Sequence, residues 1–121
     1  MMNTNKGSLA APLLKALKNS LAGLRTAWLG ERAFRQECAV LLILCIVLSA
    51  AGSSPARWLL ALGGWLGVMT AELLNSAVEK TCDLVSTDFH PLIKAAKDMA
   101  SAAIFLMLCL NAGIWIYLLA C

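Results

Sequence analysis

Three long stretches of the sequence contain no charged side chain. They cover residues 38–56, 58–71 and 99–121, which are 19, 14 and 23 residues long. A bilayer core about 30 Å thick is crossed by about 20 mostly apolar residues in a helix. The first and third stretches meet this length, and the second meets it if its helix continues through Glu72 and Asn75. The sequence therefore predicts three transmembrane helices, over about residues 34–51, 57–80 and 97–119, with a carboxylate inside the middle one.

The composition supports a membrane protein. Hydrophobic residues make up 60% of the chain and charged residues 14%, against about 45–50% and about 25% in soluble domains. A length of 121 residues suits one domain, so residues 1–121 are predicted to form a single membrane domain, too small for a soluble two-lobed kinase or a TIM barrel. The net charge of +3 is small and spread along the chain, and no nucleic acid partner is expected.

The segment over about residues 9–28 has a helical period of its own. Leu13, Leu17, Leu21, Leu24 and Trp28 recur at spacings of three and four, and basic residues fall mostly between them. This pattern predicts an amphipathic surface helix that lies in the membrane interface with its basic face toward anionic headgroups. Packing of its apolar face against the bundle is the alternative, and the two are compatible.

Basic residues also predict the orientation of the chain. Six of them precede the first apolar stretch, and three more lie in the second connection, over about 79–98. Positive charge is retained on the cytoplasmic side, so the N-terminus and the second connection are predicted to be cytoplasmic, in a multi-pass protein. The five cysteines form no CxxC pair and no cluster with the single histidine, which gives no support to a zinc or redox site. Cys82 is expected in the cytoplasmic connection.

Polar residues gather at one end of the middle apolar stretch. Glu72, Asn75, Ser76, Glu79 and Asp83 share one helical stripe over about three turns. An ionisable group at membrane depth is a functional hypothesis by default. Glu72 and Glu79 are about 10 Å apart along the helix, so different roles are expected. The deeper Glu72 is a candidate general base, and the shallower Glu79 is a candidate ligand for a hard cation. The alternative is a stripe that only holds helices together.

Further charged residues are expected at the level of Glu79. Lys97 and Asp98 stand where the third apolar helix begins, and Glu31 and Arg32 stand before the first one. Carboxylates, an amide and a lysine together are typical of Mg²⁺-assisted phosphoryl transfer, which needs a metal, a cation and a base for the attacking hydroxyl. The sequence contains neither a GxxxxGK[ST] loop nor the Gly-rich loop of protein kinases.

Three separated blocks resemble the prokaryotic diacylglycerol kinase family. They are residues 72–83 (ELLNSAVEKTCD), 31–37 (ERAFRQE) and 96–103 (AKDMASAA), and their order and spacing agree with the family over nearly the whole chain. The resemblance implies an all-α homotrimeric bundle in the bacterial inner membrane, with a surface helix and three transmembrane helices per subunit. It implies transfer of the ATP γ-phosphate to diacylglycerol, with Mg²⁺ required and active sites formed between subunits.

The resemblance also implies roles for individual residues. Glu72 is the expected general base at the lipid hydroxyl and Asn75 supports it, while Glu31 and Glu79 hold the metal with ATP. The expected nucleotide contacts are Asp88, Phe89, His90, Lys97 and Asp98. The expected lipid contacts, besides Glu72, are Ser101, Arg57, Arg32 and Arg35. Family members offer an Arg and a Tyr of the surface helix to the nucleotide; Pro12 and Asn19 stand there in this chain, which leaves Asn19 as the candidate, with Lys15 or Lys18 as substitutes.

Three alternatives accompany this prediction. A related branch of the family phosphorylates undecaprenol instead of diacylglycerol. A small proton-coupled transporter would also carry one buried Glu, although it would not need Glu31, Glu79 and Lys97 at one interface. A membrane subunit without catalysis is the third.

Overall fold

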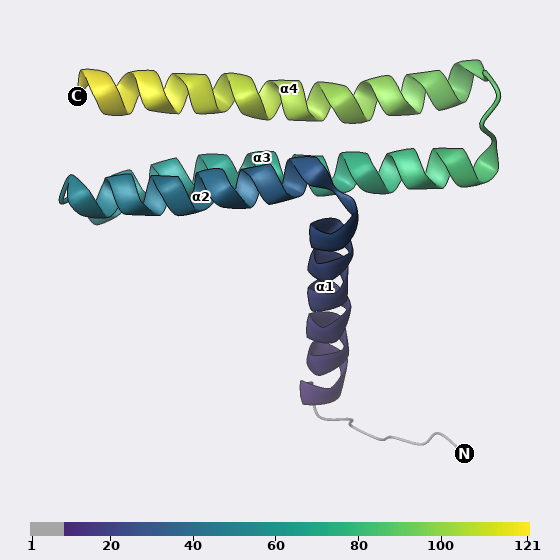
Figure 1. Ribbon diagram of the computed structural model, residues 1–121, viewed down its shortest axis with the longest axis horizontal. Coiled ribbons are helices and arrows are strands. Elements are labelled where there is room, and N and C mark those ends of the chain that lie inside the picture. Colours follow the sequence, from purple (N-terminus) through teal and green to yellow (C-terminus); the bar gives the residue numbers. More distant parts are fainter. Residues whose placement is uncertain (1–8) are drawn as a thin grey trace. The chain divides into compact units, whose positions relative to one another are not determined.

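The computed structural model describes residues 9–121, and all of its regular structure is helical (Figure 1). The four helices are α1 (Ala10–Gly30), α2 (Arg32–Ala50), α3 (Pro55–Val85) and α4 (Pro91–Ala120). The chain divides into a unit that ends at Arg32 and a unit over Ala33–Cys121. The all-α prediction is confirmed for the described residues.

The first described unit consists of α1. Its leucines, Leu13, Leu17, Leu21 and Leu24, are exposed, as is Trp28. These are the residues predicted to form the apolar face of a surface helix, and their membrane contact stays a prediction.

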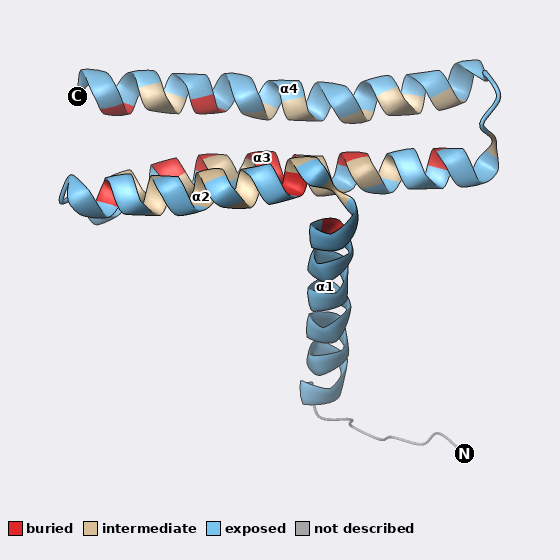
Figure 2. Cartoon of the chain, viewed as in Figure 1, coloured by how far each residue is buried: buried red, intermediate tan, exposed pale blue. Residues whose placement is uncertain are grey.

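The second unit contains three helices long and apolar enough to cross a membrane, namely α2, α3 and α4. α3 and α4 are antiparallel and pack side by side (Figure 1). Seven residues of α3 are buried, against two in each of α2 and α4 (Figure 2), so α3 is the central helix of this unit. Leu48, Ala61 and Leu118 bring the three helices together in one apolar cluster.

Local chemistry fixes the helix ends of this unit. A Schellman turn ends α2: Ser53 N–H donates to Leu48 O at 3.1 Å and Gly52 N–H to Ser49 O at 3.2 Å, with Gly52 at φ +59°. Ser54 caps α3 by accepting the Arg57 N–H at 3.4 Å, and Pro55 follows at the first helical position. Proline suits this position because its missing N–H would have no partner there.

Two helices extend beyond their predicted bounds. α3 runs five residues past the predicted end at 80, and α4 begins six residues before the predicted start at 97. Absence of charge detects the membrane-embedded turns and misses the charged turns that continue outside the apolar core. The placement of Cys82 in a connection is therefore wrong, because Cys82 is buried in α3 near its C-terminal end.

Candidate active site at the acidic end of α3 and α4

The predicted polar stripe on α3 contains a direct contact. Asn75 is buried, and its Nδ2 donates to Glu79 Oε1 at 3.2 Å, one helical turn further on. Glu79 itself is exposed. The amide therefore orients one oxygen of a carboxylate whose other oxygen has no hydrogen bond to any residue in 9–121 that the structure records.

A second carboxyl lies near Glu72, and the sequence reasoning missed it. Glu37 of α2 is close enough to Glu72 for their negative charges to repel. Its Oε2 is buried and has no hydrogen-bond partner among the described residues, and the Trp65 Nε1–H donates to its backbone oxygen at 3.0 Å. The available signal was its place at the end of the 31–37 block, one residue before the first uncharged stretch.

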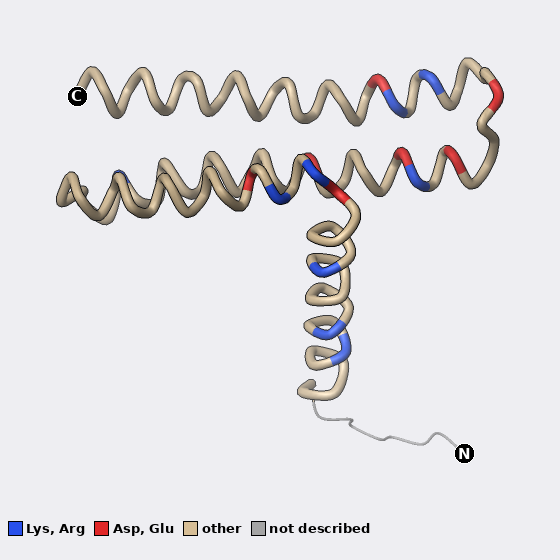
Figure 3. The backbone as a smooth tube through the Cα atoms, viewed as in Figure 1, with Lys and Arg blue, Asp and Glu red and all other residues tan. Residues whose placement is uncertain are grey.

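The start of α4 supplies cations at the same end of the unit. Lys97 Nζ donates to Asp83 Oδ1 at 2.9 Å, which joins α4 to the last turn of the α3 stripe. Asp98 pairs with Lys94 on the exposed side of α4. Charged residues of α4 are confined to its first turns, beside the α3–α4 connection (Figure 3). The structure thus brings Lys97 and Asp83 together as neighbours of Glu79.

The predicted nucleotide loop lies between α3 and α4. Its Asp88, Phe89 and His90 are all exposed. His90 also has a structural function, because its Nδ1 accepts the Leu92 N–H at 3.1 Å and so caps α4. Asp88 N–H donates to Ser86 Oγ at 3.0 Å. These contacts hold the loop, and nucleotide binding by it stays a prediction.

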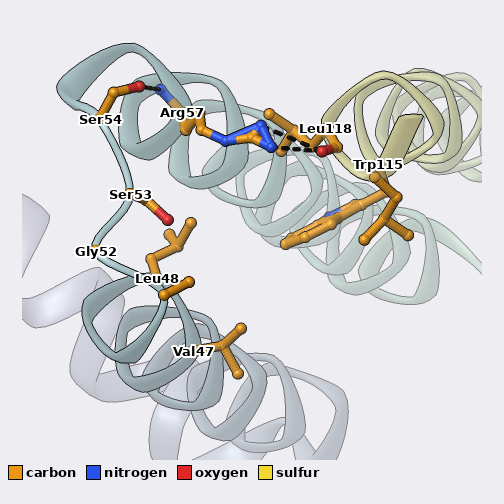
Figure 4. Close-up of a pocket in the computed structure, with 10 residues that line it drawn as sticks. Val47, Leu48, Gly52, Ser53, Ser54, Arg57, Trp115 and Leu118 are labelled. Carbon is orange, nitrogen blue, oxygen red and sulfur yellow. Dashed lines mark hydrogen bonds between the residues drawn. The ribbon is translucent and has the colours of Figure 1, made fainter. Parts of the chain in front are cut away.

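Arg57 lies at the opposite end of α3 from the acidic stripe. It precedes Glu72 by fifteen residues, about 22 Å along the helix axis. Its Nη1 and Nη2 both donate to Leu118 O, the former at 3.2 Å (Figure 4). A pocket of about 290 Å³ surrounds it, lined partly by Leu48, Ser53, Ser54 and Trp115. The structure does not bring Arg57 to the stripe, and its proposed lipid contact would fall at this other end.

The remaining candidates are exposed or belong to the first unit. Ser101 and Arg35 are exposed on α4 and α2. Asn19, Glu31 and Arg32 belong to the unit that ends at Arg32. Their predicted roles at a shared site stay predictions.

The donors on α3 fit a magnesium ion in kind. Mg²⁺ prefers carboxylate oxygens with several waters and usually takes one or two protein carboxylates plus phosphate oxygens. Glu79 offers an exposed carboxylate that Asn75 orients, as partners of metal ligands commonly do. Within residues 9–121 no group of three or more His, Cys, Asp or Glu residues forms a ready metal cage, so the ion would depend on substrate phosphates for much of its coordination.

The fold and the site together define a class of protein. Three apolar helices fit a multi-pass membrane protein, and one end of α3 and α4 gathers carboxylates, an amide and a lysine. The model for the family described as prokaryotic diacylglycerol kinase matches residues 18–119. The chain belongs to this family, and the resemblance inferred from the three sequence blocks is confirmed.

Individual relatives agree over most of their length. The diacylglycerol kinase of Helicobacter pylori strain 26695 is 48% identical over 111 residues, which cover 89% of this chain and 85% of the relative. That of Haemophilus influenzae is 40% identical over 103 residues, covering 85% and 87%. That of Escherichia coli K12 is 35% identical over 107 residues, covering 88% of each chain. Family membership makes the chain a kinase that uses ATP.

Proposed function

We propose that this protein transfers the γ-phosphate of ATP to the hydroxyl of diacylglycerol, giving phosphatidic acid and ADP. The observation that carries the proposal is the polar stripe of α3, in which a carboxylate within the span precedes an amide-oriented carboxylate nearer the connection. The lipid hydroxyl would arrive from the bilayer and ATP from water, so a base set deeper than the phosphate-binding groups matches the two substrates. The relatives' common name supports diacylglycerol as the lipid.

In this mechanism Glu72 accepts the proton of the lipid hydroxyl. The hydroxyl oxygen forms a bond to the γ-phosphorus, and the bond between that phosphorus and the β,γ-bridging oxygen breaks, which releases ADP. Glu37 of α2 lies near the Glu72 carboxylate. Lys97 supplies positive charge to the phosphates. Catalysis rests mainly on positioning and on neutralising charge.

Mg²⁺ would be held by Glu79 together with Glu31. When bound, the ion would neutralise phosphate charge. Asn75 keeps one Glu79 oxygen in place, and the exposed position of Glu79 makes its carboxylate accessible. Asp88, Phe89, His90, Asp98 and Asn19 would complete the ATP contacts. Ser101, Arg57, Arg32 and Arg35 would contact the lipid.

We further propose the cellular setting. The protein would act as a homotrimer in the bacterial inner membrane, with its N-terminus and the α3–α4 connection in the cytoplasm. Basic residues near both segments support this orientation. The abundance of exposed apolar side chains on α2 and α4 supports burial of these helices by lipid and by neighbouring subunits.

The test is a radiolabelled phosphate transfer assay with the purified protein in mixed micelles. With γ-labelled ATP and Mg²⁺, we expect label in diacylglycerol and little in undecaprenol. We expect the Glu72→Gln variant to lose about 10²–10⁴-fold in rate, the range that a positioned general base supplies. Thr70→Val is the matched control, since the Thr70 hydroxyl bonds its own helix, at Leu66 O, and it should retain activity.

Other outcomes would point to the alternatives. Label in undecaprenol alone would assign the chain to the branch of the family that phosphorylates undecaprenol. No transfer to either lipid, together with Glu72-dependent proton flux in liposomes, would favour a transporter. Full activity in Glu72→Gln trimers would remove Glu72 as the base.

A further inference from the structure

A buried amide joins α3 to α4 far from the acidic stripe. Asn111 is 6% exposed, and its Nδ2 donates to Gly64 O across the helix pair at 2.8 Å and to Met107 O of its own helix at 2.9 Å. Its Oδ1 is buried without a hydrogen-bond partner among the described residues. A buried amide is costly unless it is fully bonded, so packing alone gives no reason for an asparagine here.

Asn111 and Ile114 of α4 pack closely against Gly64. A Cβ added to Gly64 would lie 3.0 Å from Asn111 Oδ1 and 2.8 Å from Ile114 Cδ1. The space where a side chain would stand on Gly64 is therefore occupied by the Asn111 amide and the Ile114 side chain. The next glycine back, Gly63, has no atom within 4 Å of such a Cβ. The close approach is thus specific to one residue of the pair.

A second side chain follows the same register. Arg57 precedes Gly64 by seven residues and Leu118 follows Asn111 by seven. Arg57 donates to Leu118 O, so the two cross-helix bonds belong to one alignment of antiparallel helices. Both hydrogen bonds use a backbone carbonyl as acceptor. Each therefore depends on the axial position of one helix relative to the other.

Between Asn111 and the acidic stripe, the α3–α4 interface has small and large apolar side chains. There α3 and α4 border a groove of about 530 Å³. Small residues line it (Gly67, Ala71, Ala100 and Ala103) together with the larger Leu74, Val78, Leu106 and Met107, and the end of the Met107 side chain packs against Gly67. Small side chains let helices approach closely, and the unbranched methionine side chain adapts to many shapes, so this apolar packing specifies an axial register less sharply than a directional hydrogen bond does. A buried asparagine is the residue type best attested for fixing helix register.

The same alignment leads to the proposed active site. Fourteen residues beyond Gly64 is Val78, and fourteen before Asn111 is Lys97. Because the helices are antiparallel, Ala96 and Lys97 lie level with Glu79 and Val78, and the long Lys97 side chain reaches Asp83. A slip of one helical turn would move Lys97 by about 5.4 Å relative to Glu79.

We propose that Asn111 is a positioning residue. Its hydrogen bond to Gly64 O fixes the axial register of α4 on α3 and so holds Lys97 near the level of Glu79. The consequence for ATP rests on the proposed function, whereas the register itself does not. Asn111 contacts no predicted substrate group and acts through the helix pair.

The test combines kinetics with a register measurement. Asn111→Leu and Gly64→Ala should raise the KM for ATP about tenfold or more, because small misplacements of a positioned group are costly, with the KM for lipid little changed. Gly63→Ala is the matched control and should behave as the parent. Gly64→Ala keeps the Asn111 side chain, so this variant still tests the inference if Asn111→Leu fails to assemble.

The register is measured by the rate of disulfide formation between the native Cys82 and a cysteine introduced on α4. The other four cysteines are replaced by alanine. Cys82 is buried on α3, eighteen residues past Gly64, and Ile93 stands eighteen before Asn111. Ile93→Cys should cross-link faster than Ala96→Cys, and the ratio should fall when Asn111→Leu is added. An unchanged ratio with an unchanged KM for ATP would overturn the inference. Absence of lipid phosphorylation in the parent protein would overturn the proposed function and leave the cross-linking result valid.

Discussion

The two ends of the α3–α4 pair are held together by different kinds of bond. At the acidic end, near the connection, Lys97 bonds the Asp83 side chain, and both are well exposed. At the apolar end, Arg57 and Asn111 bond backbone carbonyls beside the cluster of Leu48, Ala61 and Leu118. Backbone acceptors cannot move without the helix, whereas exposed side chains can exchange one partner for a ligand. The apolar end therefore sets the geometry that the acidic end uses.

After Glu72→Gln, the largest effect at the acidic end should come from the metal ligand Glu79. Glu79→Gln removes the charge but keeps the shape and the contact with Asn75. We expect the Mg²⁺ concentration for half-maximal rate to rise about tenfold or more, as losses at metal sites commonly do, with lipid affinity little affected. A magnesium titration of the lipid kinase rate measures this. An unshifted titration would remove Glu79 from the metal site.

At the apolar end, Arg57→Met should act on stability. The variant loses both guanidinium bonds to Leu118 O, and bonds from a charged donor are worth about 1.5–3 kcal/mol. Thermal unfolding in detergent, followed by circular dichroism, should show a lower midpoint, partly restored in Arg57→Lys. A raised KM for lipid with an unchanged midpoint would instead assign Arg57 to lipid binding.

Variants of His90, which caps α4 at the connection, distinguish a structural role from a contact with nucleotide. His90→Ala removes the acceptor of the Leu92 N–H and should cost about 1 kcal/mol of stability, while His90→Asn should restore much of it because Asn is a good cap. Melting curves and the KM for ATP are measured on both variants. If His90 also binds nucleotide, the KM stays raised in His90→Asn although the stability returns.

The smallest effect on stability is expected for the exposed ion pair. Asp83→Asn should leave the melting temperature unchanged, because solvent-exposed pairs contribute little. The KM for ATP should rise less than in Lys97→Met, since the variant keeps the cation and loses only its orientation. A marked drop in melting temperature would mean that the acidic end also holds the helices together.

Much of the candidate site was predictable from helical period alone. Asn75 and Glu79 are one turn apart on any α-helix, so their contact followed once the helix was recognised. Glu37 was not predictable in this way, because its neighbour Glu72 is 35 residues away in the chain. Asn111 looked like one polar residue in an apolar helix, and its partner is a backbone carbonyl of Gly64, which carries no side-chain signal.

The sequence by itself determined the membrane class, the three spanning helices, the stripe on α3 and the family, because these depend on local period, on absence of charge and on blocks of fixed spacing. Tertiary structure decided how α4 is aligned with α3, and with it which residues stand level with Glu79. The physical reason is that axial register is set by a few contacts to backbone atoms. Every residue presents the same backbone carbonyl, so the side-chain sequence does not reveal which one will be bonded.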